Sequence, residues 1–330
     1  MKPFLVAALG VCAAAAQIPP RVGDINFYGL HRVAASRVLA ATGIHSGSVL
    51  PASKGDLEEA IERNSDVVLA RVEGVCCDGP DAVLFIGVEE RGALHPSFLS
   101  PPAGHARLPD ELIGTYSSFL DAVAKAAARG STTEDLTAGH SMMDDPAARA
   151  IQPRFVAFAA DHLDWLREVL HNCPEPEERA VAAAVIGYAP DKAKVLDDLQ
   201  TALQDSDESV RANALRALTA IAVYAGKNPE LHIRVSATWM VELLNSIVLN
   251  DRLEAVKALV ILTDSPNPAA LALVRERALP ALAEMARWKT LRYALPPFLL
   301  LGRATGIPEE QIHRAWEKGD REAVVAKALR

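Results

Sequence analysis

The chain has 330 residues, of which 50% are hydrophobic and only 5% are aromatic. Alanine accounts for 58 of them, so most of the apolar content consists of small side chains that favour helices. The 34 Lys and Arg residues are outnumbered by 42 Asp and Glu residues, which gives a formal net charge of −8. This composition excludes a disordered chain. It also argues against a nucleic-acid partner, because such binders neutralise phosphates with a basic surface.

Residues 1–16 predict a signal peptide. Lys2 is followed by an apolar run, and Ala13 to Ala16 are the small residues that a signal peptidase requires beside the cleaved bond. The apolar run is shorter than the roughly 20 residues that cross a bilayer as a helix. We therefore expect cleavage near Ala16, a periplasmic or secreted location, and no stable membrane insertion of the mature chain.

Three cysteines follow the predicted signal peptide, namely Cys76, Cys77 and Cys173. An odd number in an oxidising compartment leaves at least one thiol unpaired or shared between chains. The sequence leaves three arrangements open: a bond between the adjacent Cys76 and Cys77, a bond from one of them to Cys173, and buried free thiols.

Residues 17–91 predict a small α+β domain. Alternating apolar and polar residues indicate strands, and apolar residues three or four positions apart indicate helices. In chain order, the patterns cover residues 25–28 (strand), 34–41 and 54–64 (helices), and 67–75 and 82–90 (strands). The last two strands flank Asp78-Gly79-Pro80-Asp81, which is typical of a hairpin turn. The predicted order is β-α-α-β-β.

This domain resembles a POTRA domain, the periplasmic module of outer-membrane assembly and secretion proteins. The resemblance rests on residues 22–30 (VGDINFYGL), on Ala41-Thr42-Gly43 at the end of the first helix, and on residues 83–90 (VLFIGVEE). It implies binding of another protein, often by pairing an exposed strand edge with a partner segment. The alternative is a small capping domain that has no partner of its own.

Residues 92–108 predict a semi-rigid linker, because three prolines and two glycines interrupt any periodicity there. Residues 109–330 predict a helical domain. An apolar stripe over 112–123 indicates one helix that ends at Gly130, and residues 152–170 indicate another. Later helical patterns are interrupted at Pro280 and at Pro296-Pro297, where a kink or a break is expected, and a helix pair is expected at the carboxyl end.

The helical region contains internal repeats. Residues 178–187 align with residues 210–219 when Arg179 and Arg211 are superposed, and a third copy at 251–259 carries Arg252. Repeats of this length indicate stacked helix pairs. Residues 207–218 resemble a HEAT repeat of the form D-x-x-V-R-x-x-A-x-x-A-L, which implies an α-solenoid. We expect structural roles for the motif residues: inter-repeat ion pairs for the arginines and a helix cap from Asp205, Ser206 or Asp207.

The sequence contains no common enzyme signature. The sequence lacks a nucleophile elbow, a zinc-protease helix, a Cys-x-x-Cys pair, a phosphate loop and a dinucleotide fingerprint. We therefore expect a protein without enzymatic activity or a cofactor.

One polar loop offers a different chemistry. Residues 134–145 include acidic side chains, two methionines and His140, and His162 follows on the next helix. Imidazole and carboxylate together bind transition metals, so the candidate metal ligands are His140, Asp144 and His162. The alternatives are that the acidic pair caps a helix beginning at Pro146, and that His162 is a buried core histidine.

The sequence thus predicts a mostly α protein of the α+β class, with a small sheet domain followed by a solenoid of HEAT-like helix pairs. The expected function is that of an exported, non-enzymatic scaffold that binds another protein with the concave surface of the solenoid. The POTRA-like domain would supply a second protein contact. Two alternatives are a metal-binding protein that uses the loop around His140 and a structural spacer of the cell envelope.

Overall fold

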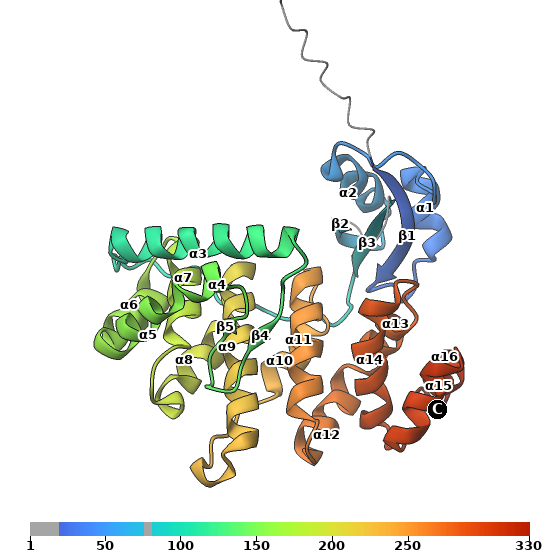
Figure 1. Ribbon diagram of the computed structural model, residues 1–330. Helices are drawn as coiled ribbons and strands as arrows, with labels where there is room; N and C mark the ends of the chain where they lie inside the picture. Colours follow the sequence, from blue (N-terminus) through green and yellow to red (C-terminus); the bar gives the residue numbers. More distant parts are fainter. Residues whose placement is uncertain (1–19, 76–80) are drawn as a thin grey trace, which may run out of the picture.

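The computed structural model describes residues 20–75 and 81–330, and its chain forms a small sheet domain followed by a row of helices (Figure 1). The predicted fold class is confirmed. The predicted signal peptide, the pair Cys76 and Cys77, and most of the predicted hairpin turn lie outside the described residues. Cys173 is buried and has a free thiol. None of the described helices combines the length and apolar character needed to span a membrane.

The small domain has the predicted order β-α-α-β-β. Its elements are β1 (Arg21–Tyr28), α1 (Ala35–Thr42), α2 (Lys54–Glu62), β2 (Val67–Val75) and β3 (Asp81–Glu90). The strand order is β1-β3-β2, with β1 parallel and β2 antiparallel to β3. Gly43 ends α1 in the left-handed conformation, with φ of 67°, and the Ser53 side chain caps α2. Both helices pack on one face of the sheet, where Val38, Leu57 and Ile61 are buried.

The outer edge of β2 is already hydrogen-bonded within the domain. The N–H groups of Ala70 and Val72 donate to the carboxylates of Glu62 and Glu58, each at 2.8 Å. Both glutamates come from α2. A partner strand would therefore have to displace two carboxylates before it could pair with this edge.

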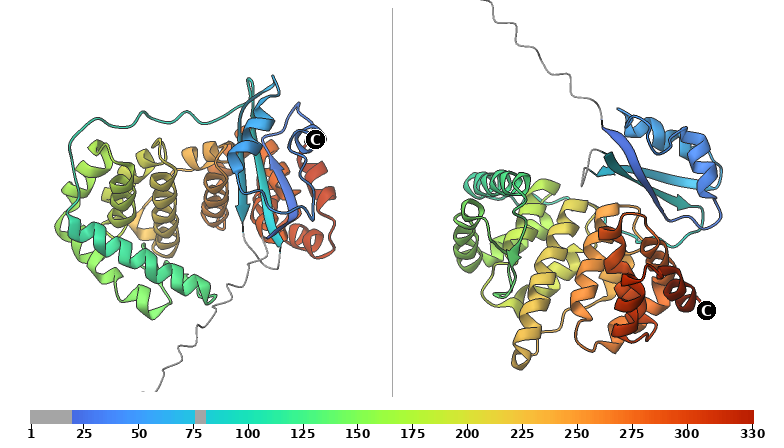
Figure 2. Two further views of the ribbon diagram at one scale, coloured as in Figure 1. Left: turned by 90° about the horizontal axis from the view of Figure 1, so that it is seen from above. Right: turned by 45° about the vertical axis from the view of Figure 1, so that its right-hand side comes forward.

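The second part of the chain consists of helices with short connecting elements. They are α3 (Asp110–Ala128), β4 (Glu134–Asp135), β5 (Met142–Met143), α4 (Pro146–Arg149), α5 (Gln152–Asp161), α6 (Leu163–Asn172), α7 (Pro176–Ile186), η1 (Lys192–Val195), α8 (Leu196–Ala202), α9 (Glu208–Lys227), η2 (Pro229–Leu231), α10 (Thr238–Leu243), α11 (Leu249–Leu262), α12 (Pro268–Arg277), α13 (Leu279–Ala286), α14 (Leu291–Ala304), α15 (Glu309–Glu317) and α16 (Arg321–Ala328). Helices α6, α8 and α10 pair with α7, α9 and α11, and α7, α9, α11 and α14 pack in sequence. Figure 2 shows these helices as one row. The result is an α-solenoid, and we call it the helical array.

Small residues set the spacing of the array. Ala182, Ala183 and Ala214 have no exposed surface. A Cβ placed on Gly187 would come within 2.8 Å of the Ala217 Cβ, so α7 and α9 approach closely there. This close approach explains why these positions hold alanine and glycine, because larger side chains there would push the two helices apart.

Two details differ from the sequence prediction. Residues 152–170 form two helices, α5 and α6, because the chain leaves helical geometry at His162 (φ −131°, ψ 32°). His162 is consequently exposed, and the prediction of a buried histidine is wrong. Of the kink or break predicted at Pro296-Pro297, the break does not occur, since α14 continues through both prolines. Burial of Phe298 and Leu301 in the same helix offsets the lost hydrogen bonds.

Pro280, in contrast, marks a helix start. It lies in the first turn of α13, directly after α12 has ended. Proline is well tolerated there because the first turn has no partners for its N–H groups. The interruption predicted at this residue is therefore a boundary between two helices.

The predicted linker at 92–108 lies against the array. In Figure 2 it runs from the sheet domain along one side of the helix row to α3. The Leu99 N–H donates to the Gln204 carbonyl (2.8 Å), and the Trp165 Nε1–H donates to the Arg107 carbonyl (2.7 Å). The Phe98 ring covers the Arg211 guanidinium, with its centroid 3.9 Å from Cζ. The segment is held at several points along its length.

Three buried arginines link successive helix pairs. Arg179, Arg211 and Arg252 are each the fourth residue of their helix, in α7, α9 and α11, and they are 1%, 1% and 4% exposed. Each guanidinium donates to the carbonyl six residues earlier, at 3.0, 2.8 and 2.5 Å respectively. This shared contact shows that the three copies are structurally equivalent. We call this series the arginine ladder.

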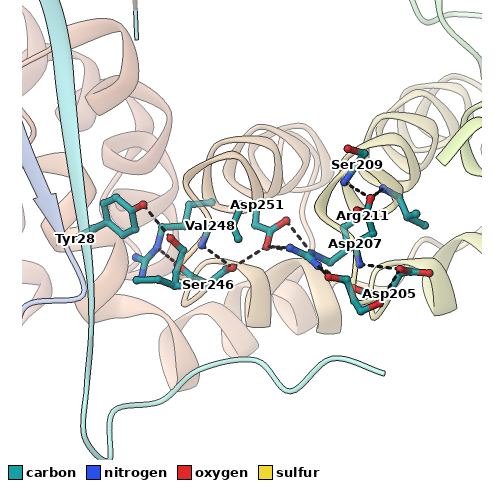
Figure 3. A network of polar contacts seen from close by, with 12 residues as sticks. Tyr28, Asp205, Asp207, Ser209, Arg211, Ser246, Val248 and Asp251 are labelled. Carbon is teal, nitrogen blue, oxygen red and sulfur yellow. Dashed lines mark hydrogen bonds and ion pairs between the residues drawn. The ribbon is translucent and has the colours of Figure 1, made fainter. Parts of the chain in front are cut away.

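Two of these arginines also bind a carboxylate of the following helix pair. Arg179 donates two hydrogen bonds of 2.8 Å to Asp205, which lies just before α9. Arg211 binds the fully buried Asp251 of α11 at 2.8 Å, and Ser246 donates to the same carboxylate (Figure 3).

The Asp207 side chain accepts from the N–H groups of Ser209 and Val210 and so caps α9.

The arginine ladder ends on the sheet domain. Within residues 20–75 and 81–330, no carboxylate lies at ion-pair distance from Arg252, and its Nη1 has no hydrogen-bond partner. Its guanidinium lies over the ring of Tyr28, 4.8 Å from the centroid, and the Tyr28 hydroxyl donates to the Ile247 carbonyl. Burial lowers the pKa of Arg252. The Tyr28 ring therefore covers Arg252 much as the Phe98 ring covers Arg211.

Further contacts fix the sheet domain to the end of the array. The Asn26 amide accepts from the Lys289 N–H (2.8 Å), and the Trp288 Nε1–H donates to the Phe27 carbonyl (2.8 Å). The Phe85 and Trp288 rings meet edge to face at 5.0 Å. Glu284 accepts from the N–H groups at the end of β1, and burial raises its pKa in spite of the nearby Arg252. One face of the sheet thus packs on α13 and the start of α14.

Replacement of Arg211 by Ala should destabilise the protein by about 3–5 kcal/mol, because it leaves the Asp251 carboxylate buried and unpaired. Urea unfolding followed by circular dichroism measures the change. Arg275→Ala is the matched control, since Arg275 is exposed on α12. Equal midpoints for the two variants would show that the arginine ladder does not hold the helix pairs together.

Candidate functional site

Helix α3 crosses the array next to α7 and α9 (Figure 1). Side chains of these helices line a pocket of about 110 Å³. Side chains from α3, α5, α7, α9 and the β4–β5 hairpin line it. They are Tyr116, Phe119, Leu120, Val123, His140, Ser141, Phe155, Ala184, Gly187, Tyr188, Asn213, Arg216 and Ala217. We call it the α3 pocket.

The walls of the pocket come from the apolar stripe of α3. Leu112, at the start of the helix, is buried, but Leu120 is 49% exposed. The ring of Phe155 meets Phe119 edge to face at 5.5 Å and Tyr116 at 5.9 Å. These rings hold the walls in place. The stripe is therefore only partly covered by the rest of the array, and it leaves an apolar opening.

The floor of the pocket is formed by small residues of α7 and α9, namely Ala184, Gly187 and Ala217. The close approach of the two helices requires such residues, as described above. Because their side chains are short, they also leave room between the array and α3. The short side chains that let α7 and α9 pack closely thus also leave the space of the pocket.

Asn213 and Arg216 supply polar groups at the pocket. The Asn213 amide donates to the Tyr116 hydroxyl (3.2 Å) and to the Ala180 carbonyl (2.8 Å), so both of its N–H groups are used. Burial raises the pKa of Tyr116. Arg216 is half exposed and forms an ion pair with Glu134 at 3.3 Å. The Glu134 carboxylate also accepts from the Ser141 hydroxyl.

A buried lysine lies behind the pocket. Lys192 is 4% exposed, and its Nζ donates to the Gly187 carbonyl (2.8 Å) and contacts His140 Nδ1 at 3.3 Å. In the described part of the chain, no carboxylate lies at ion-pair distance from this ammonium group. Burial lowers the pKa of Lys192 to about 8. At neutral pH, Lys192 is therefore a cation without a compensating anion in contact.

His140 is neutral in this setting. Burial and then the charge of Lys192 lower the pKa of His140 to about 4, while Asp135 opposes the shift. Its ring lies 4.9 Å from that of Tyr188. Since Nδ1 accepts from Lys192, the ring proton is on Nε2, and His140 can donate one hydrogen bond.

The structure does not bring the predicted metal ligands together. His140 contacts Lys192. Asp144 is exposed, and its carboxylate lies 3.8 Å from the Arg149 guanidinium. His162 is exposed, and its ring lies beside those of Phe158 and Trp165. Across residues 20–75 and 81–330, no three His, Cys, Asp or Glu side chains lie close enough to hold a metal ion. The ammonium group next to His140 would also repel a second cation.

The acidic pair in the same loop has a structural contact. Asp145 accepts from the N–H groups of Ala147 and Ala148 at the start of α4 and pairs with Arg129 at 2.6 Å. Burial alone would raise the pKa of Asp145, but these N–H groups and the guanidinium lower it. The carboxylate therefore serves as a helix cap.

Sequence reasoning did not find Lys192, Asn213 or Arg216. Lys192 lies in a polar stretch that looks like any exposed turn. Asn213 offered a signal, because it is a polar residue inside the most regular repeat of the chain. The apolar stripe of α3 was predicted, but its incomplete burial depends on how α3 crosses the array.

Comparison with known families supports the repeat assignment. A family model described as HEAT repeats matches residues 163–246, which run from α6 to α10. The floor of the α3 pocket lies inside this range, whereas α3 and the β4–β5 hairpin lie outside it. No curated protein matches the chain.

His140 should titrate with a pKa of about 4 rather than 6.5. Between pH 6.5 and pH 4 the His140 imidazole is protonated in the unfolded chain but neutral in the folded protein. The free energy of unfolding therefore decreases as the pH falls from 6.5 to 4. Lys192→Met should raise the pKa of His140 part of the way toward 6.5, because burial remains. An NMR titration of the His140 ring protons measures both values.

The control for this titration is Lys194→Met on the same short helix, since Lys194 is 66% exposed and lies near Asp191. It should leave the pKa of His140 unchanged. A His140 pKa near 6.5 in the unaltered protein would contradict the arrangement described for Lys192.

Proposed function

We propose that this protein is a non-enzymatic scaffold that binds another protein at the α3 pocket of its helical array. The observation that carries the proposal is an apolar pocket with polar groups at its rim, open at Leu120. Protein interfaces draw much of their affinity from such pockets, which take one anchoring side chain of the partner. Repeat arrays also provide extended surfaces for partners without catalytic groups.

We further propose that the chain is exported. The support is the pattern of residues 1–16, in which a basic start and an apolar run precede Ala13 to Ala16. On this proposal the mature protein is periplasmic or secreted and begins at Gln17.

We propose two alternative roles for the POTRA-like domain. It either makes a second protein contact or caps the helical array. The hydrogen bonds from Ala70 and Val72 to α2 weigh against strand pairing at β2. The contact between Arg252 and Tyr28 favours the capping role, because the domain then covers a buried guanidinium at the end of the arginine ladder.

Export predicts a defined amino terminus. Protein isolated from the cells that produce it should begin at or near Gln17, as read by mass spectrometry of the intact chain and its first peptide. A cytoplasmic protein that retains Lys2 would contradict export and would leave the scaffold proposal untouched.

Partner binding at the α3 pocket can be tested by site-specific photo-crosslinking in those cells. A crosslinker in place of Leu120 should give a defined adduct with one partner, because this side chain is at the opening of the pocket. The matched control is the same crosslinker in place of Leu231, which is similarly exposed (46%) but lies on η2 after the end of α9. Equal adducts at both positions, or none at Leu120, would contradict the proposed site.

A further inference from the structure

We propose that the α3 pocket recognises the carboxyl-terminal residue of its partner, with the apolar side chain between the aromatic walls and the free carboxylate toward Arg216 and His140. This inference rests on the proposed function, since it names the segment that the same pocket binds. Three independent features support it: the size of the pocket, its charge and its hydrogen-bond donors.

The size of the pocket fits one side chain. Its volume is about 110 Å³, and an apolar cavity of about 150 Å³ in another protein holds one benzene molecule. The walls are the rings of Tyr116, Phe119 and Phe155, and the floor residues are small. A single Leu or Phe side chain of a partner would therefore fill it.

The charge around the pocket favours an anion. Lys192 and Arg216 are two cations. Among the described residues Glu134 is the one carboxylate at ion-pair distance from either of them, and Glu254 acts on Arg216 from further away. Asp135 is fully exposed to solvent and acts on His140 from a distance. A carboxylate bound at the pocket would compensate the charge of the buried Lys192.

The hydrogen-bond donors at the pocket also fit a carboxylate. Asn213 has used both of its N–H groups inside the protein. The Arg216 guanidinium bonds Glu134 through one nitrogen, and its other N–H groups have no partner in the described part of the chain. His140 adds its Nε2–H. Cationic and imidazole donors beside an apolar volume recognise an apolar group that carries an acceptor.

A chain end satisfies these requirements better than an internal acidic residue. In a carboxyl-terminal Leu or Phe, the side chain and the carboxylate branch from the same Cα. One residue can then reach both the aromatic walls and the donors. An internal segment would place its charge on a different residue, and its chain would have to continue past the floor formed by α7 and α9.

The test compares two tetrapeptides, acetyl-Ala-Ala-Ala-Phe with a free carboxylate and the same peptide with a terminal amide. Binding to the full chain is followed by NMR through the methyl signals of Ala184 and Ala217. We expect the free acid to bind at least about tenfold more tightly than the amide. Equal affinities, or no binding of the acid at millimolar concentration, would overturn the proposal.

Variants assign the effect to the named charges. Arg216→Gln and Lys192→Met should each bring the affinity of the free acid close to that of the amide. Arg275→Gln and Lys194→Met are the matched controls and should keep the preference. Arg216 is half exposed, so its variant tests the proposal even if Lys192→Met fails to fold. Retention of the preference in the folded Arg216→Gln variant would overturn the role of Arg216.

Competition separates this proposal from the proposed function. Excess free acid should abolish the adduct formed by the crosslinker at position 120, while the amide should not. An adduct that persists in the presence of bound acid would overturn carboxyl-terminal recognition and leave the scaffold role standing. Absence of any adduct at position 120 would instead count against the scaffold role itself.

Discussion

The architecture depends on a buried guanidinium at the fourth position of successive helices. Each of Arg179, Arg211 and Arg252 satisfies the carbonyl six residues before it, and so closes the turn that leads into its own helix. Arg179 and Arg211 also reach a carboxylate of the next pair. One side chain therefore fixes both the turn within a repeat and the register between repeats. Because a buried charge is costly without its partners, this contact penalises any other stacking of the helices.

The α3 pocket follows from the same packing. Alanine and glycine let α7 and α9 approach closely, and short side chains on two adjacent helices leave a shallow floor. Helix α3 crosses this floor with an apolar stripe that is only partly buried there. His140 also lines the space, and its Nδ1 contacts the buried Lys192. The pocket combines residues from five segments, so it belongs to no single repeat.

The parts of the fold that the sequence predicted are those controlled by local patterns. Alternation in β2 and β3, the aligned arginines and the stripe on α3 all appear at the expected residues. The errors arose where tertiary contacts decide. His162 ends a helix although its neighbours suit one, and α14 keeps two prolines because its other side chains are buried. For the site, His140 was identified for its metal-binding chemistry, but its neighbour is Lys192, which lies 52 residues further along the chain.

The attachment of the sheet domain to the far end of the array has a consequence for how the chain is made. Asn26 bonds Thr290, which lies 264 residues later in the sequence. During synthesis the sheet domain emerges well before its docking surface on α13 and α14. Until then, Tyr28 and Phe85 have no array to cover them, and chaperones commonly hold such exposed apolar faces. The sheet domain can therefore dock only after α13 and α14 have been synthesised.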